Sequence, residues 1–256
     1  MKKKRYTLIT IASLIVFLGV WELLTDVMHV KPDYILPSPI QVLKALIAKL
    51  YQTKPDGSIL LTHIGTSLKV ALSGYCLAVA VGIPMGIAMA WFKKVDQFIK
   101  PLFDFIRSIP PIGWIPIMIL MFGIGTGAKA AVIFLSTFIP CVLNAYTGIK
   151  STKQVHIWVA ETFGASSSQV LFKVAIPSAL PQIFTGLKVA LSTAWMTLVG
   201  AELLAATSGL GYMIQIARML GRPDIIIAGM LAIGVIGAIF AFVLDKIEKK
   251  FVKGRF

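Results

Sequence analysis

Apolar stretches long enough to cross a lipid bilayer dominate this sequence and restrict what it can fold into. Six such stretches can be drawn, at residues 7–28, 65–92, 110–124, 128–149, 182–206 and 225–245. A helix needs about 20 apolar residues to cross the hydrocarbon core, because each residue adds about 1.5 Å. The chain is 57% hydrophobic and 14% charged, with a mean hydropathy of +0.84, which is more apolar surface than one soluble core can bury. We therefore predict an all-α membrane protein with about six transmembrane helices.

The N-terminal stretch has two interpretations, because a basic cluster from Lys2 to Arg5 precedes its apolar run. A secretory signal would begin in the same way. However, the run from Thr7 to Met28 is a full bilayer long, and no small-x-small cleavage site follows it. We therefore expect residues 1–30 to form a retained transmembrane helix.

The segment between the first two spans, residues 31–64, is predicted to be extracytoplasmic and amphipathic. Pro32, Pro37 and Pro39 favour an extended start. The run QVLKALIAKL that follows has one apolar face at helical spacing, which favours a helix along the membrane surface. Residues 65–250 then form the core of the protein.

Basic residues are distributed unevenly between the connections, and this distribution predicts the orientation. If the N-terminus is inside the cell, sixteen lysines and arginines lie on the inner side and seven on the outer side. Cytoplasmic connections carry the excess of basic residues, so both termini are predicted to be cytoplasmic. The formal net charge of +14 comes from these clusters and therefore indicates topology, not a nucleic-acid partner.

Glycine, proline and other small residues distinguish three of the spans. The second span carries a small residue at every fourth position from Gly74 to Ala90, which favours close helix packing within the chain or between subunits. The third span contains Pro110, Pro111 and Pro116, so we expect an irregular start. The sixth span is smooth, and we expect it to contribute packing only.

Signatures of catalysis are missing from the sequence. There is no phosphate-binding GxxxxGK[ST] loop, and His29, His63 and His156 lie far apart, without metal-ligand spacing. The serine run at 166–168 has no histidine and carboxylate nearby in sequence. We therefore predict no enzyme activity, no catalytic residue and no metal site in this chain.

The fifth span carries polar residues on one face. At about 100° per residue, six side chains fall within about a 100° arc. They are Thr185, Lys188, Ser192, Trp195, Val199 and Glu202. Charges in a bilayer are costly unless they face a bundle interior or a wet cavity, so this face is a candidate translocation pathway. Alternatively, Lys188 and Glu202 lie near opposite ends of the span, where each could extend to water.

A polar interruption follows the fourth span and lies on the predicted cytoplasmic side. Ala160 to Val174 is predicted to form one amphipathic helix, with Gly164 and the small residues after it offering a surface for close docking. Pro177 and Pro181 are predicted to end that helix before the fifth span begins.

This interruption resembles the signature of the binding-protein-dependent permease subunits of type I ABC importers. That signature has a glutamate-alanine-alanine segment, then a glycine, then a hydrophobic-x-hydrophobic-proline group. The matching positions here are Ala160, Gly164, Val174, Ile176 and Pro177.

The match has one departure. Trp158 and Val159 stand where the family most often has glutamate and alanine, and Glu161 lies three places after the expected glutamate.

Further segments resemble the nitrate, sulfonate and taurine branch of this family. They are ILPSP at 35–39, RSIPPIGWIPIMILMFGIGTGAKAAVIF at 107–134, GAS at 164–166 and TAWMTLVGAELLAATSGLGYMIQIAR at 193–218. The resemblance implies import of a small anionic solute such as nitrate, a sulfonate or taurine. The same branch includes importers of bicarbonate and of a thiamine-precursor pyrimidine, and both alternatives stay open.

The resemblance also implies partners and a location. Residues 158–177 would form a coupling helix, and the ATPase-coupling residues would be Ala160, Glu161, Gly164, Ala165, Ser166 and Pro177. Two copies of the chain would assemble with two cytoplasmic ATPase subunits and an extracytoplasmic solute-binding protein, in the lipid of a bacterial cytoplasmic (inner) membrane. ATP and magnesium would bind the ATPases, so no cofactor is expected in this chain.

Two other classes of function compete with the importer. An ion-gradient-driven secondary transporter or channel would need no ATPase, but the sequence shows neither an inverted repeat nor paired mid-membrane carboxylates. A structural membrane scaffold would move no solute at all.

Overall fold

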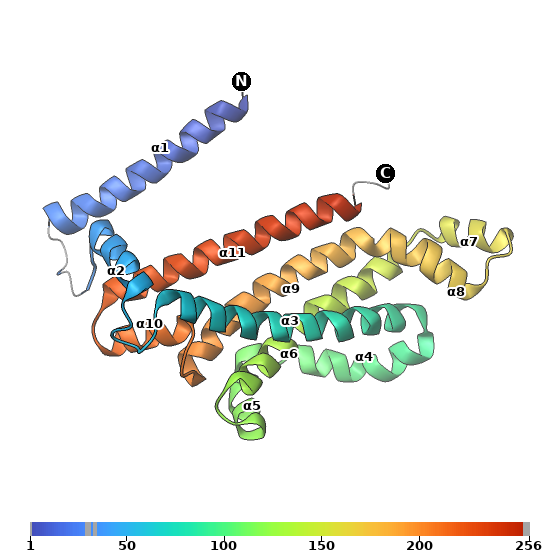
Figure 1. The fold of residues 1–256 in the computed structure, drawn as a ribbon. Coiled ribbons are helices and arrows are strands. Elements are labelled where there is room, and N and C mark those ends of the chain that lie inside the picture. The colour runs from blue at the N-terminus through green and yellow to red at the C-terminus, as the bar shows by residue number, and fades with distance from the viewer. Residues whose placement is uncertain (1, 29–31, 33–34, 253–256) are drawn as a thin grey trace. The chain divides into compact units, whose positions relative to one another are not determined.

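The structure, a computed structural model, describes residues 2–28, 32 and 35–252. Within that part of the chain the regular elements are all helical, which confirms the predicted all-α class (Figure 1). The α-helices are α1 (Lys2–Glu22), α2 (Pro39–Tyr51), α3 (Leu60–Trp91), α4 (Lys93–Arg107), α5 (Ile115–Phe122), α6 (Thr126–Lys150), α7 (Gln154–Thr162), α8 (Ser167–Val170), α9 (Ile176–Ala205), α10 (Leu210–Met219) and α11 (Pro223–Val252). Leu23–Val27 and Leu171–Ala175 are π-helical, and Pro111–Trp114 is a 3₁₀ turn.

Four helical stretches in the described part of the chain are long and apolar enough to cross a membrane. They are Leu60–Trp91, Thr126–Lys150, Ser167–Leu204 and Pro223–Lys250. A fifth candidate is the pair formed by α4 and Pro111–Phe122, which is bent by 92°. The irregular start predicted for the third span is confirmed by its 3₁₀ turn, while α1, at the first predicted span, is not among the candidates. The structure therefore supports four or five of the six predicted spans.

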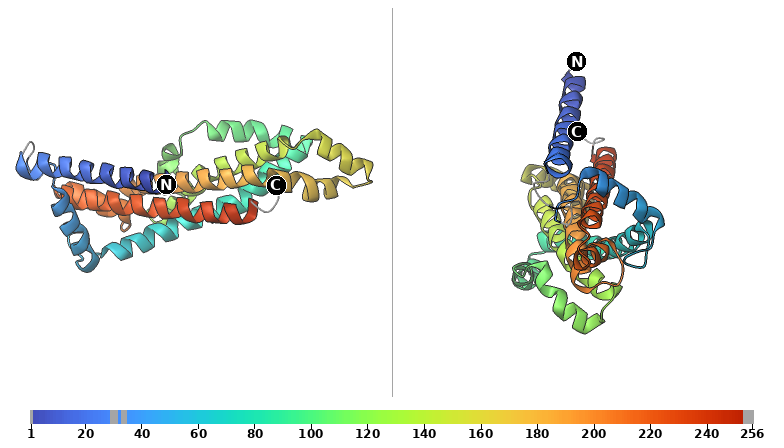
Figure 2. Two further views of the ribbon diagram at one scale, coloured as in Figure 1. Left: turned by 90° about the horizontal axis from the view of Figure 1, so that it is seen from above. Right: turned by 90° about the vertical axis from the view of Figure 1, so that its left-hand side faces the viewer.

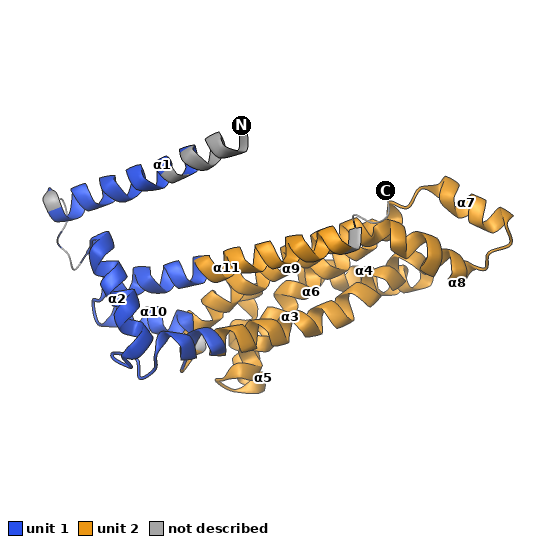
Figure 3. Ribbon diagram, turned by 45° about the horizontal axis from the view of Figure 1, so that its top comes forward, with its two compact units in different colours: residues 1–65, 208–234 blue, residues 66–207, 235–256 orange. Residues whose placement is uncertain are grey.

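The chain divides into two compact units, shown in separate colours in Figure 3. Unit 1 comprises residues 1–65 and 208–234, and unit 2 comprises residues 66–207 and 235–256. The predicted candidate coupling and pathway residues all belong to unit 2.

The centre of unit 2 is the pair of helices α6 and α9, which run alongside each other (Figure 2). Small residues permit this approach, since a Cβ atom on Gly186 of α9 would lie 2.5 Å from Cβ of Asn144 on α6. A polar contact joins the same helices, because Gln182 Nε2 donates to Asn144 Oδ1 over 2.9 Å. The two helices are thus held by close backbone packing and an interhelical hydrogen bond.

The small-residue stripe of α3 packs against α6 inside the same chain. A Cβ atom on Gly74 would lie 2.7 Å from Ile133, and one on Gly86 would lie 2.5 Å from the carbonyl oxygen of Val142. Ala78 and Ala90 on the same stripe are buried. The intramolecular alternative of the prediction is confirmed.

In unit 1, Ser38 fixes the start of α2. Its hydroxyl accepts the N–H of Gln41, and the Gln41 side chain accepts the N–H of Ser38, which is a capping box. The predicted helix is therefore present, but its buried side consists of Val42, Ala45 and Lys49. Its position on a membrane surface stays a prediction.

A buried polar cluster in unit 1 was not predicted from the sequence. Lys49 Nζ donates to Asp56 Oδ1 and to the carbonyl of Ser58, each over 2.6 Å. His63 Nε2 lies 3.3 Å from the same Asp56 oxygen, and the Gly209 N–H donates to His63 Nδ1 over 3.1 Å. All three charged or titratable side chains are almost inaccessible to solvent, so this cluster anchors the loop between α2 and α3.

Candidate functional site

The predicted single helix from Ala160 to Val174 is interrupted in the structure. Helix α7 ends at Thr162, and Gly164 adopts a left-handed φ of +81°. The Gly164 N–H donates to the Glu161 carbonyl and the Ala165 N–H to the Ala160 carbonyl. These two bonds form a Schellman motif, in which glycine is favoured because a Cβ atom would strain the backbone. The prediction of one continuous helix was therefore wrong.

Ser166 begins the next helical segment. Its hydroxyl accepts the Gln169 N–H, and the Gln169 side chain accepts the Ser166 N–H, which forms a second capping box. The Trp91 indole donates to Ser167 Oγ over 3.3 Å and so connects the start of α8 to the end of α3.

The two prolines do not end the helix, contrary to the prediction. A continuous helical stretch runs from Ser167 to Leu204, with a π-helical turn at Leu171–Ala175. Pro177 closely follows the π-helical turn, where the register of the helical hydrogen bonds changes, and Pro181 lies inside α9. The segment that begins at Ser167 and the fifth span therefore form one continuous helical element.

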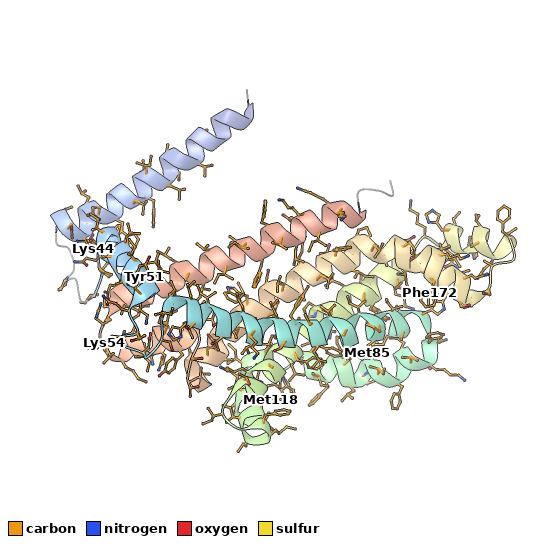
Figure 4. The ribbon with its side chains drawn as sticks, in the orientation of Figure 1. Lys44, Tyr51, Lys54, Met85, Met118 and Phe172 are labelled. Atoms are coloured by element: carbon orange, nitrogen blue, oxygen red, sulfur yellow. The ribbon has the colours of Figure 1, made fainter. Side chains whose placement is uncertain are left out.

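Large apolar side chains stand exposed on α7, on the turn after it and on the π-helical segment. We name this set the α7–α8 surface: Val155, Trp158, Val159, Phe163 and Phe172 (Figure 4 labels Phe172). Phe163 is 88% exposed, which is unusual for a phenylalanine unless a partner or lipid covers it.

The predicted coupling residues lie at or near this surface. Glu161, Gly164 and Ser166 are exposed, and Ala160, Ala165 and Pro177 are partly buried. Trp158, at the position of the expected glutamate, adds an apolar side chain to the surface.

The first charged residue of the predicted polar face of α9 is Lys188, which forms two ion pairs with α11. Its Nζ lies 2.5 Å from Asp245 Oδ1 and 2.5 Å from Glu248 Oε2. The side chains of Lys188, Asp245 and Glu248 remain partly exposed to solvent. The expectation that the sixth span contributes packing only was wrong, because α11 supplies both carboxylates.

A cavity of about 250 Å³ lies between α9 and α11, next to these ion pairs. It is lined by Lys188, Leu191, Ser192, Trp195, Met196, Gly237, Phe240, Ala241, Leu244 and Asp245. The Trp195 and Phe240 rings meet edge to face, with centroids 5.2 Å apart. The cavity, which we name the α9–α11 cavity, thus combines charged groups of both signs with aromatic walls.

Glu202 lies elsewhere, in a buried position. The Ser67 hydroxyl of α3 lies 2.8 and 2.9 Å from its two carboxylate oxygens, and Lys129 of α6 is near enough to interact electrostatically. Glu202 is 1% exposed, so the alternative in which it extends to water does not hold in this structure.

The structure brings together only part of the predicted pathway face. Lys188, Ser192 and Trp195 line the α9–α11 cavity, whereas the lining does not extend to Val199 or Glu202 among the described residues. Sequence reasoning missed Asp245, Glu248 and Ser67. The two acidic residues, three positions apart at the end of an apolar helix, were the available signal. Among the described residues no cluster of three or more histidine, cysteine or acidic side chains could hold a metal ion.

Comparison with known proteins shows the class: a multi-pass inner-membrane permease subunit of an ABC importer. The chain belongs to the family of binding-protein-dependent transport system inner membrane components, whose model matches residues 82–254. It is 39% identical over 241 residues to the taurine transport system permease protein of Escherichia coli (strain K12), covering 94% of this chain and 86% of that protein. It is 29% identical over 254 residues to the nitrate import permease protein of Leptolyngbya laminosa, covering 96% and 89%.

The fold is also similar to that of a solved transporter. A structure of the MetNI methionine ABC transporter in an inward-facing conformation matches with a TM-score of 0.67 at 17% identity, covering 75% of this chain and 95% of the matched chain. This likeness confirms the predicted type I importer permease fold.

Proposed function

We propose that two copies of this permease import a small solute bearing an oxyanion group, such as nitrate, a sulfonate or taurine. An extracytoplasmic binding protein would deliver the solute, and two cytoplasmic ATPase subunits would supply the energy. The relatives that transport taurine and nitrate support this class of solute. The ATPases would hold ATP and magnesium, and this chain would hold no cofactor.

One structural observation carries the proposal. The continuous helical stretch from Ser167 to Leu204 carries Phe172 of the α7–α8 surface near its start and the cavity residues Ser192 and Trp195 further along. The rest of that surface lies on α7 and the turn that precedes this stretch. Movement of an ATPase that contacts Phe172 and the start of α8 would therefore be transmitted along this helical stretch to the cavity residues. Rigid-body motion of this kind is how many transporters alternate access between the two sides of the membrane.

The α7–α8 surface is the proposed ATPase contact. Its exposed aromatic side chains are the type that fills pockets at protein interfaces, where a few buried aromatic residues supply most of the binding energy. Ala160 and Glu161 lie in the last turn of α7, and Gly164, Ala165 and Ser166 follow in the loop before α8. Pro177 lies at the start of α9.

The substitution Phe163→Asp tests this contact. Phe163 is 88% exposed, so the change should leave the fold intact while placing a charge in the interface. We expect loss of ATPase co-purification and at least a tenfold loss of ATP-driven uptake, because hot-spot truncations cost about 2 kcal/mol or more. Tyr51→Asp is the matched control, since Tyr51 is 81% exposed but lies on the predicted outer side (Figure 4). Full ATPase retention by the Phe163 variant would contradict the proposal.

A neutral pyrimidine is a second candidate solute, supported by one observation. Trp195 and Phe240 form an aromatic wall of the α9–α11 cavity, and aromatic walls bind flat rings. Competition experiments, in which uptake of the natural solute is measured with the cognate binding protein, separate the two solute classes. Inhibition of this uptake by sulfonates supports an oxyanion solute, and inhibition by an aminopyrimidine supports a pyrimidine solute.

A further inference from the structure

Among the solutes of the proposed function, the charge balance at Lys188 favours a zwitterion such as taurine over a simple anion such as nitrate as the occupant of the α9–α11 cavity. One ammonium group faces two carboxylates, those of Asp245 and Glu248. An inorganic anion arriving there would meet an excess of negative charge and would have to displace a carboxylate. A ligand that brings its own positive charge would not meet this penalty.

Lys188 still has the capacity to bind an oxyanion. An ammonium group has three N–H donors, and among the described residues the two carboxylates account for two of them. Ser192, one helical turn further along α9, lines the same cavity and is exposed. Its hydroxyl can donate a second hydrogen bond to the same oxyanion.

The carboxylate beside Lys188 suits a cation. Asp245 lines the cavity, and its side chain is 54% exposed. The Trp195 and Phe240 rings line the same cavity and form its apolar wall, against which the hydrocarbon part of a small zwitterion can pack.

Gly237 helps to keep this space open. A Cβ atom at Gly237 would lie 3.5 Å from Trp195 Cδ1, which is ordinary contact, so alanine fits but a longer side chain would enter the cavity. The cavity of about 250 Å³ exceeds the space of one water, about 30 Å³ in the liquid, and so admits a small organic molecule.

We propose that the α9–α11 cavity binds a zwitterion that lies alongside the Lys188–Asp245 ion pair, with its oxyanion end at Lys188 and Ser192 and its ammonium end at Asp245. The proposal rests on the proposed function, because it assumes that this cavity is a binding site on the translocation pathway of the imported solute. The same chemistry occurs in the headgroup of phosphatidylethanolamine, so the experiment distinguishes a solute from a lipid.

Two probes that differ by one amine test the proposal. The permease assembly, in nanodiscs of phosphatidylglycerol without ATP or binding protein, is titrated with radiolabelled taurine and with ethanesulfonate. We expect taurine to bind at least about tenfold more tightly, the effect of one charge-assisted contact. Asp245→Asn should reduce the ratio of taurine affinity to ethanesulfonate affinity to near one. Equal binding of both probes to the wild type, or a ratio unchanged by Asp245→Asn, would overturn the proposal.

Two further variants separate ligand binding from folding. Asp104→Asn removes a carboxylate that pairs with Arg107 on α4, outside the α9–α11 cavity, and should leave the ratio unchanged. Gly237→Leu should abolish taurine binding, whereas Gly237→Ala should preserve it. Monodisperse assembly of each variant is checked by size-exclusion chromatography.

An additional experiment with phosphatidylethanolamine distinguishes an imported solute from a lipid headgroup as the natural occupant. If the solute is the natural occupant, adding phosphatidylethanolamine to the nanodiscs leaves taurine affinity unchanged. If the lipid headgroup occupies the cavity, phosphatidylethanolamine weakens taurine binding and co-purifies with the wild type but not with Asp245→Asn. Failure to bind taurine together with no retained lipid would overturn the proposal.

The failure of this inference is distinguishable from failure of the proposed function. ATP-driven uptake that persists without amine selectivity would overturn the zwitterion site only. Selective binding without any ATP-driven uptake would overturn the importer and leave the site standing.

Discussion

At the scale of single residues, the glycines of α3 show what spacing predicts and what it leaves open. The four-residue spacing from Gly74 to Ala90 predicts a close helix contact, and the contact is present. The partner helix was not predictable, because a stripe of small residues is equally suited to a contact within the chain or between subunits. The structure shows that the partner is the backbone of α6 in the same chain.

Gly86→Ala should destabilise this contact. The new Cβ would lie 2.5 Å from the Val142 carbonyl oxygen, a backbone atom that cannot rotate away. We expect a loss of about 1–3 kcal/mol, typical of overpacking, measured by thermal unfolding in detergent. Gly65→Ala is the control, because nothing lies within 4 Å of its Cβ position. A melting temperature for the Gly86 variant equal to that of the control would show that α3 and α6 are not packed this closely.

Asp56→Asn tests the buried cluster of unit 1. The change would leave the Lys49 ammonium, 2% exposed, without its carboxylate, and uncompensated buried charges cost about 3–5 kcal/mol. The melting temperature measured by thermal unfolding should therefore be markedly lower than that of the wild type. The double variant Lys49→Met with Asp56→Leu should recover most of the stability, since a buried ion pair can be replaced by apolar side chains. A single variant as stable as the wild type would mean that Lys49 reaches water.

At the scale of elements, the interruption between α7 and α8 was wrongly predicted for an identifiable reason. Gly164 and the S-x-x-Q pattern at 166–169 are a helix stop and a helix start, but the small residues were interpreted as a docking surface. Pro177 and Pro181, in contrast, led to the prediction of a helix end where the helix continues. Proline removes an N–H from the helical hydrogen-bond ladder, but a π-helical turn at Leu171–Ala175 closely precedes Pro177, and the helix continues through it.

Gly164→Ala and Gly164→Asn separate backbone strain from steric docking. Nothing lies within 4 Å of the Cβ position, so either substitution acts through the left-handed φ of +81°. Left-handed geometry costs alanine about 1–2 kcal/mol, and asparagine tolerates it better. We expect lower ATP-driven uptake for the alanine variant than for the larger asparagine variant. The reverse order would show that side-chain volume at an ATPase contact controls uptake.

At the scale of the whole molecule, apolar length and basic residues predicted the all-α class and most of the spans, because a bilayer imposes a simple length rule. The contents of the α9–α11 cavity were less predictable. The face of α9 was visible in the sequence, but its partners Asp245 and Glu248 come from a helix nearly 60 residues away. Ser67 likewise reaches Glu202 across 135 positions. Long-range pairs of this kind have no periodic signature.

Orientation is the remaining whole-molecule prediction, and it follows from the charge bias of sixteen inner to seven outer basic residues. A green fluorescent protein fused after Phe256 should fluoresce, because that reporter folds in the cytoplasm. Alkaline phosphatase inserted at Gly57, in an exposed turn with no atom near its Cβ position, should be active, because that enzyme needs an extracytoplasmic location. The same insertion in the turn at Gly164 should be inactive, which places the α7–α8 surface where an ATPase can reach it. Activity at Gly164 combined with inactivity at Gly57 would invert the topology and exclude cytoplasmic coupling through α7 and α8.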